Sequence, residues 1–295
     1  MNSKKSIINI ISSNFLNLRP YSWIDIILLG FLAKFYATKT IEFVFNDIFV
    51  VAGLVSLWFF FNLILEAKHD YEYRQKASVS SALFFLFIAF LIGFFINPIS
   101  IVFIIISTIL VFTYLKKKDS VFFGVMSAVV RGLIQFSYFL FAVYFVGLEI
   151  NFDLLIVSLV IFVLYFCRAI IGDVRDYKHN AKSGKITIPV ALGCKKSRKV
   201  VSVLLILSSA IMIMHFNSVL IALPLLLYSF VVLFYRNGFV LHQLKIVTTS
   251  FFLINLILFL TGGNLVFMNL IYLGLFLNHI FYPLLIRKSN PLFVQ

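Results

Sequence analysis

The chain alternates between long apolar runs and short polar stretches that hold most of its charged residues. The apolar runs cover residues 21–37, 44–65, 77–115, 121–146, 153–171, 200–235 and 246–286. About 20 helical residues cross the hydrocarbon core of a bilayer, so these runs predict membrane-spanning helices. The three longest runs exceed one crossing and divide at Asn97-Pro98, near 215–217 and at 262–264. The pattern therefore predicts ten hydrophobic segments, some short enough to be tilted or re-entrant.

Composition supports this interpretation. Apolar residues make up 62% of the 295 residues, charged residues 12%, and the mean hydropathy is +1.06. A soluble domain cannot cover that much apolar surface, so the chain is expected to be an integral membrane protein. Cys167 and Cys194 have no metal-ligand spacing and form no disulfide framework.

The basic residues indicate how the chain is oriented. The net charge of +14 could indicate a nucleic-acid partner, but 22 of the 25 Lys and Arg lie at the N-terminus or in every second loop. Topology explains this clustering better than nucleic acid does, and the positive-inside rule places these loops in the cytoplasm. Residues 1–20 are expected to form an interfacial amphipathic segment, and residues 21–295 a single membrane domain.

Two polar groups follow apolar runs on the same predicted cytoplasmic side. In the first group, Asn62, Glu66 and Asp70 are spaced at i, i+4 and i+8, which places them on one helix face. Oxygen ligands in this arrangement suit a hard divalent cation. The alternative is that the group is a polar loop that happens to follow a membrane helix.

The second group lies in the stretch RAIIGDVRDYKHNAKSGKITIPVALG at 168–193. Asp173, Asp176 and Asn180 are three and four residues apart and would project from one helix face. Arg175 and Lys178 beside them suit a phosphate group. Four crossings separate the two groups, so topology brings both to the same side of the membrane, where they could share a site.

Arg131 interrupts the apolar run 121–146 near its middle. A charged side chain at this depth is costly by roughly 2.5–3.5 kcal/mol on insertion scales, so it is expected to face a cavity or a partner. It could contact a bound ligand, or it could pair with a buried carboxylate such as Asp25 or Asp153. The 37 Phe could line a cavity, or they could pack against one another and against lipid.

Several of these motifs together resemble the UbiA-type intramembrane prenyltransferases. That family opens with a basic residue, Pro and Trp, and the chain has RPYSW at 19–23. The first aspartate-rich motif of the family matches Asn62, Glu66 and Asp70, and its Tyr-x-x-x-Lys matches Tyr114 and Lys118. Its second motif matches Asp173, Asp176, Asn180, Gly184, Thr187 and Pro189. The chain departs from the family at Leu63, Glu66 and Asn180. Leu63 and Asn180 each remove a charge, which leaves fewer anionic ligands, whereas Glu66 keeps a carboxylate.

The resemblance implies an all-α polytopic protein with nine or ten transmembrane helices around a central cavity. It implies an integral protein of a bacterial or archaeal-type cell membrane that transfers an isoprenoid from a prenyl diphosphate, with Mg²⁺, to a lipophilic or aromatic acceptor such as a quinone precursor. The implied metal ligands are Asn62, Glu66, Asp70, Asp173, Asp176 and Asn180. The implied diphosphate contacts are Arg19, Tyr114, Lys118, Arg131, Arg175 and Lys178, and Asp70, Asp176 and Lys118 are the expected catalytic residues.

Two other functions remain open at this point. A polyprenyl-phosphate phosphoribosyl or glycosyl-type transferase would use the same fold and metal site on a sugar diphosphate. A secondary transporter would carry polar, broken helices at the bilayer midplane, whereas the acidic groups here follow the ends of the spans.

Overall fold

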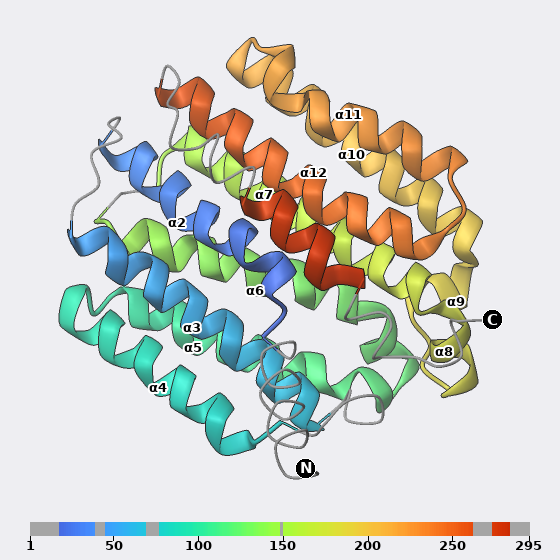
Figure 1. Cartoon of the computed structure of the whole chain (residues 1–295), viewed down its shortest axis with the longest axis horizontal. Helices are drawn as coiled ribbons and strands as arrows, with labels where there is room; N and C mark the ends of the chain where they lie inside the picture. The colour runs from blue at the N-terminus through green and yellow to red at the C-terminus, as the bar shows by residue number, and fades with distance from the viewer. Residues whose placement is uncertain (1–17, 39–44, 69–76, 148–149, 262–272, 284–295) are drawn as a thin grey trace, which may run out of the picture.

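The computed structural model of the protein describes residues 18–38, 45–68, 77–147, 150–261 and 273–283 (Figure 1). All regular secondary structure within these ranges is helical, and they contain no strand. The all-α fold class predicted from the apolar runs is thereby confirmed. The predicted interfacial segment 1–20 and Asp70 fall mainly or wholly outside the described residues.

The long helices match the predicted spans closely. They are α2 (Trp23–Thr38), α3 (Phe45–Lys68), α4 (Val79–Ile96), α5 (Ser100–Leu115), α6 (Val121–Phe145), α7 (Phe152–Arg175), α10 (Cys194–Phe216), α11 (Val219–Phe234) and α12 (Gly238–Thr261). The short elements are η1 (Pro20–Ser22), η2 (Lys116–Lys118), α8 (Tyr177–Lys182) and α9 (Ile188–Leu192). Residues 273–283 form one more helical stretch.

Six of these helices are long and apolar enough to cross a membrane, namely α3, α4, α6, α7, α10 and α12. The helices α5 and α11 are equally apolar but shorter. The total number of crossings, nine or ten, stays a prediction.

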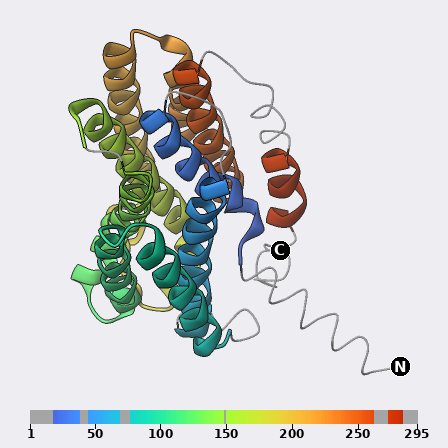
Figure 2. The same ribbon diagram turned by 90° about the vertical axis from the view of Figure 1, so that its left-hand side faces the viewer.

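Successive long helices run in opposite directions, so the bundle has two ends (Figure 1). We call the site end the one where α3, α5, α7 and α11 finish and where α2, α4, α6, α10 and α12 begin. Figure 2 shows residues 273–283, in red, on the side of the bundle that carries α2 and α12. This stretch packs on both helices: Gly274 lies against Ile24, and the Tyr282 hydroxyl donates to the carbonyl of Phe239 at 3.2 Å.

The helices differ in how much protein surrounds them. In the most apolar 18-residue stretch of α6, 78% is buried inside the protein, compared with 33% in α10 and 17% in α4. The interior helices are therefore α3, α6 and α7, whereas α4, α10 and α11 present exposed Phe, Leu and Ile side chains on their outer faces. Those faces have the composition expected of a lipid-contacting surface.

Two breaks and two helix starts show what hydropathy detects. The chain turns at Asn97-Pro98 and at Asn217, which ends α10 in the left-handed conformation with a φ of 50°. Both turns were predicted. In contrast, α10 begins six residues before the apolar run at 200, and α12 begins eight residues before the run at 246. Helices continue past the apolar region into the polar boundary, where backbone hydrogen bonds still favour them.

Ion pairs inside the bundle hold neighbouring helices together. Lys34 of α2 pairs with Asp47 of α3, and Arg168 of α7 pairs with Asp25 of α2. Arg168 and Lys245 were predicted to be loop cations, but both lie within helices and are buried. The Nζ of Lys245 has no hydrogen-bond partner among the described residues and lies 5.5 Å from the ring centre of Tyr228.

Candidate active site

The end of α3 presents a buried amide and a buried carboxylate. Asn62 and Glu66 are one helical turn apart and fully buried. The Asn62 amide nitrogen donates to the Trp58 carbonyl at 2.7 Å, and its Oδ1 is buried without a hydrogen-bond partner in the described part of the chain. Arg19, just before η1, lies 3.4 Å from a carboxylate oxygen of Glu66. This contact ties the entry of α2 to the end of α3.

The end of α7 contributes a second carboxylate, Asp173. Its Oδ1 accepts a hydrogen bond from the Nζ of Lys117 at 2.6 Å and a longer one from the amide nitrogen of Asn180 at 3.4 Å. Asp173, Lys117 and Asn180 come from α7, η2 and α8, so three separate elements meet at this oxygen. All three side chains are largely buried, as expected for charges that are paired.

Asp176 adopts a different arrangement from its predicted neighbours. The helix α7 ends at Arg175, and Asp176 separates it from α8, so the predicted single helix face is interrupted. The Asp176 carboxylate receives two hydrogen bonds from the Arg175 guanidinium, at 2.7 and 2.8 Å. The structure thus brings Asp173 and Asn180 together, whereas Asp176 contacts the arginine beside it.

Two close backbone contacts fix the geometry of this region. A Cβ on Gly124, near the start of α6, would lie 2.5 Å from the carbonyl oxygen of Ile186. A Cβ on Gly238, at the start of α12, would lie 2.8 Å from the Cα of Arg175. Only glycine allows these approaches without displacing the backbone, so α6 and α12 pack directly on the segment that carries Asp173 and Asn180.

Tyr114 lies between the end of α3 and the Lys117–Asp173 pair. Its ring lies 5.7 Å from the ring of Phe61 on α3, and the Nζ of Lys117 lies 5.7 Å from the centre of the Tyr114 ring. Burial alone would lower the pKa of Lys117. The electrostatic attraction of Asp173 and Tyr114, together with the hydrogen bond to Asp173, raises this pKa above its usual value. Lys117 therefore keeps its positive charge in the folded protein.

Sequence reasoning chose Lys118 rather than Lys117, because Lys118 completes the Tyr-x-x-x-Lys motif. The side chain of Lys118 lies outside the described part of the structure. The helix α5 ends at Leu115, and η2 continues as a 3₁₀ turn. With three residues per turn, the position three after Tyr114 comes beside it, which is position 117.

Arg131 lies deeper in the bundle and faces the aromatic side chains of α3. Its guanidinium carbon is 3.9 Å from the ring centre of Phe61 and 5.0 Å from that of Trp58. One terminal nitrogen is buried and has no hydrogen-bond partner among the described residues. The carboxylates suggested as structural partners pair elsewhere: Asp25 with Arg168, and Asp153 with His215 at 3.2 Å.

Several uncharged polar side chains are also buried without hydrogen-bond partners among the described residues. Gln135 is one turn beyond Arg131 on α6, and both of its amide atoms are buried and unpartnered within the described residues. The same holds for the hydroxyls of Tyr165 and Thr187. Buried polar groups normally have partners, so each marks a position where a ligand or water could bind. Uncharged polar residues within apolar runs were the available signal for Gln135 and Tyr165, and sequence reasoning did not use it.

Arg175 and Lys178, also predicted to bind the diphosphate, line a cavity on the opposite side of α8, between α10 and the α11–α12 turn. Arg175 also approaches Nδ1 of His242 at 3.2 Å, and that nitrogen lies 2.8 Å from the hydroxyl of Tyr282. His242 and Tyr282 are buried, and neither was among the predicted site residues.

The residues present could hold a divalent cation only together with other ligands. Within the described ranges, no three His, Cys, Asp or Glu side chains form a metal-binding group. The oxygens that fit a hard cation are the unpartnered Oδ1 of Asn62 and the carboxylates of Glu66 and Asp173. A complete coordination sphere would need oxygens from outside this set, such as those of Asp70 or of a bound diphosphate.

These features define a class: a helical membrane protein with buried carboxylates, amides and cations at one end of an aromatic-rich bundle. The chain belongs to the UbiA prenyltransferase family, whose model matches residues 74–257. The predicted family is thereby confirmed, and the chain is an integral membrane protein.

Solved structures share the fold. A digeranylgeranylglyceryl phosphate synthase has a TM-score of 0.63 and 14% identity, and the match covers 85% of this chain and 99% of that one. A UbiA homolog from Archaeoglobus fulgidus bound to DMAPP and Mg²⁺ has a TM-score of 0.62 and 15% identity, covering 84% and 99%. The same homolog bound to GPP and Mg²⁺ has a TM-score of 0.61 and 14% identity, covering 94% and 99%. No curated protein matches the chain by sequence.

Proposed function

We propose that this protein transfers a prenyl group from a prenyl diphosphate to an aromatic or other membrane-accessible acceptor. The observation that carries the proposal is the Lys117–Asp173–Asn180 cluster, connected through Tyr114 and Phe61 to the buried Arg131. A substrate with a charged head and an apolar tail fits this polarity. Family membership and the Archaeoglobus fulgidus structures bound to DMAPP or GPP with Mg²⁺ support the same donor class.

The diphosphate head would bind at the site end. Lys117 carries a stable positive charge, and Arg19 lies beside Glu66 on the facing helix. Both cations contact protein carboxylates in this structure. Phosphate and carboxylate oxygens are both strong charged acceptors for Lys and Arg donors, so a bound diphosphate would share these cations with the carboxylates. Tyr114 and Lys118 remain proposed contacts on the same side.

Mg²⁺ is the proposed cofactor, and it would neutralise the charge that develops on the departing diphosphate. The proposed ligands are Asn62, Glu66, Asp70, Asp173, Asp176 and Asn180. Asn62 is suited to this role because its Oδ1 is buried and has no partner among the described residues. Asp176 would first have to exchange its hydrogen bonds with Arg175.

The prenyl tail would lie among the buried side chains of α3, α5 and α6. Trp58 and Phe61 are almost completely buried, and their rings already contact a cation, the guanidinium of Arg131. Ring faces that attract a guanidinium also attract an allylic cation. A dry site would protect that cation from water until the acceptor attacks. Gln135 and Tyr165 offer unpartnered polar groups for the polar part of an acceptor.

The test is a transfer assay in membranes that contain the protein. Radiolabelled prenyl diphosphates of different chain length would be combined with a panel of phenols, aromatic acids and lipid alcohols, with Mg²⁺ or with EDTA. We expect labelled lipid-soluble product only with Mg²⁺ and only when a prenyl diphosphate is supplied. Product from phosphoribosyl diphosphate and none from any prenyl diphosphate would contradict the proposal, as would solute transport into vesicles without either activity.

A further inference from the structure

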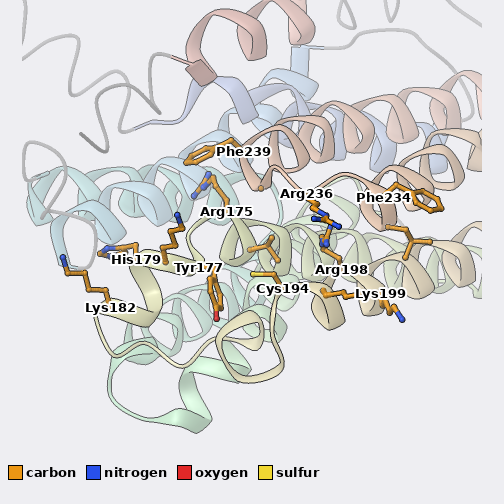
Figure 3. A pocket seen from close by; sticks show the side chains of 15 residues that line it. Arg175, Tyr177, His179, Lys182, Cys194, Arg198, Lys199, Phe234, Arg236 and Phe239 are labelled. Atoms are coloured by element: carbon orange, nitrogen blue, oxygen red, sulfur yellow. The ribbon is translucent and has the colours of Figure 1, made fainter. Parts of the chain in front are cut away.

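The cavity lined by Arg175 and Lys178 has a volume of about 960 Å³. It lies at the site end between α8, the first turns of α10 and the turn from α11 to α12 (Figure 3). Seven of its fifteen lining residues are Lys or Arg, and none is Asp or Glu. We call this cavity the basic groove. Its cations besides Arg175 are Lys178, Lys182, Lys195, Arg198, Lys199 and Arg236.

Carboxylates of the described residues balance little of the positive charge in the basic groove. Arg175 pairs with Asp176, but the other six cations have no carboxylate partner among the described residues. Arg198 donates to the backbone carbonyl of Tyr235, which holds its side chain beside the α11–α12 turn. Six cations around one cavity repel each other, and a bound anion would relieve this repulsion.

The basic groove borders the candidate active site at Arg175 but is a separate cavity. Its lining includes neither Asp173 nor Lys117, and it includes none of the buried aromatic residues near Arg131. The Arg175–Asp176 pair and the close contact between Gly238 and Arg175 lie at its inner boundary. A ligand in the basic groove would therefore not occupy the proposed diphosphate position.

One wall of the basic groove is apolar and continues onto the outer surface of the bundle. Leu233, Phe234 and Phe239 line it, and Phe234 is 79% exposed. Further along the outer faces, Val203 on α10 and Phe230 on α11 are also exposed. Cations at the end of the helices thus stand next to a surface suited to acyl chains. A soluble anion would make no contact with this apolar surface.

We propose that the basic groove binds the phosphate headgroup of an anionic phospholipid, whose acyl chains extend along α10 and α11. Clusters of Lys and Arg beside membrane helices bind anionic lipid headgroups, and guanidinium groups match phosphate geometry. Free phosphate shares the headgroup chemistry, so the test separates the two sources. The inference does not depend on prenyl transfer, because it concerns binding at a different cavity.

The experiment measures lipid binding to the purified protein by native mass spectrometry. Phosphatidylglycerol is titrated against the wild type, with phosphatidylcholine as the neutral comparison. The groove variant is Lys195→Gln/Lys199→Gln/Arg236→Gln. The charge-matched control is Lys68→Gln/Lys116→Gln/Lys196→Gln, which removes three exposed cations at the same end that do not line the basic groove.

We expect phosphatidylglycerol to bind more tightly than phosphatidylcholine. Each basic side chain near an anionic headgroup contributes roughly fivefold in affinity, so the groove variant should bind at least tenfold more weakly. The control should change less than about twofold. Inorganic phosphate at the lipid concentration should not displace the lipid.

Equal losses in both variants would mean general surface attraction and would overturn the proposal. So would equal binding of the two lipids. Displacement by inorganic phosphate would identify a soluble-anion site and would overturn the lipid assignment. If the groove variant elutes as an aggregate, Lys182→Gln/Lys199→Gln provides a milder change, for which at least a fivefold loss is expected; no loss there would overturn the proposal.

Discussion

Two clusters of cations lie at the same end of this molecule and differ in every other respect. In the candidate active site, Lys117 and Arg19 are largely buried, and each lies within 3.4 Å of a carboxylate oxygen. In the basic groove, Lys195, Lys199 and Arg236 are exposed and have no carboxylate partner among the described residues. Burial makes an unpaired charge very costly, whereas water solvates the exposed ones.

This difference determines how each region should respond to substitution. At a buried ion pair, removing one side chain leaves an uncompensated charge, so a single change has a large effect. In the basic groove, the cations act through their summed field, so each contributes little and salt weakens all of them. We therefore expect specific recognition at the first region and graded, salt-dependent recognition at the second.

The largest expected effect is on stability, at the buried pair between α7 and α2. Arg168→Ala leaves Asp25 charged and buried, and breaking such a pair costs about 3–5 kcal/mol. The midpoint of thermal unfolding in detergent should fall sharply. Asp25→Asn combined with Arg168→Met should recover part of the loss, because it removes both charges. An unchanged midpoint in Arg168→Ala would mean that buried pairing does not stabilise this bundle.

The next effect is on activity. Asp173→Ala removes the carboxylate that holds Lys117 and Asn180, and the rate of prenyl transfer should fall by about 10²–10³, the loss seen when one preorganised electrostatic contact is removed from an active site. The matched control is Asp153→Ala, at the opposite end, whose side chain is 58% exposed and pairs with His215. That variant should keep more than half of the wild-type rate. Equal losses in both variants would indicate a general effect on folding.

A smaller effect is expected at Arg131. Lysine keeps the charge but lacks the planar guanidinium that lies against Phe61 and Trp58. Arg131→Lys should raise KM for the prenyl diphosphate by roughly tenfold, because a desolvated cation–π contact is worth about 2 kcal/mol or more and lysine would keep only part of it. A lower unfolding midpoint with an unchanged KM would identify Arg131 as a structural residue.

The smallest effect is the one that keeps the two regions apart. The groove variant Lys195→Gln/Lys199→Gln/Arg236→Gln should change kcat and KM for the prenyl diphosphate by less than about twofold in detergent, since exposed substitutions away from a site have small effects. A tenfold change in KM would show that the basic groove and the active site form one binding surface.

The fold was predictable because the apolar runs are long and their breaks are explicit. Asn97-Pro98 and the polar residues near 217 mark turns that the structure contains, and the run from 121 to 146 became α6 almost unchanged. Burial in lipid requires a continuous helix for each run, so hydropathy alone determines most of the helix bounds.

The details of the site were less predictable, because they depend on how helices end. Lys117 lies against Tyr114 because α5 ends in a 3₁₀ turn, which the motif spacing does not indicate. Asp176 does not share a helix face with Asp173, because α7 ends at Arg175, one residue before Asp176. Arg168 pairs with a residue 143 positions away, which no local pattern can indicate. Helix ends and long-range pairs are decided by tertiary packing, which sequence spacing does not record.

The most direct test of the central claim is the protection of the purified protein against heat by its proposed substrate. A ligand that binds the native state raises the unfolding midpoint, and the stabilisation grows with the logarithm of the ligand concentration once that concentration exceeds Kd. With Mg²⁺, a panel of prenyl diphosphates should raise the midpoint of the wild type and of Asp153→Ala, and EDTA should remove the effect. Asp173→Ala should show little protection. If no prenyl diphosphate protects the wild type, or if Asp173→Ala is protected equally, the proposed binding of a prenyl diphosphate at this site is wrong.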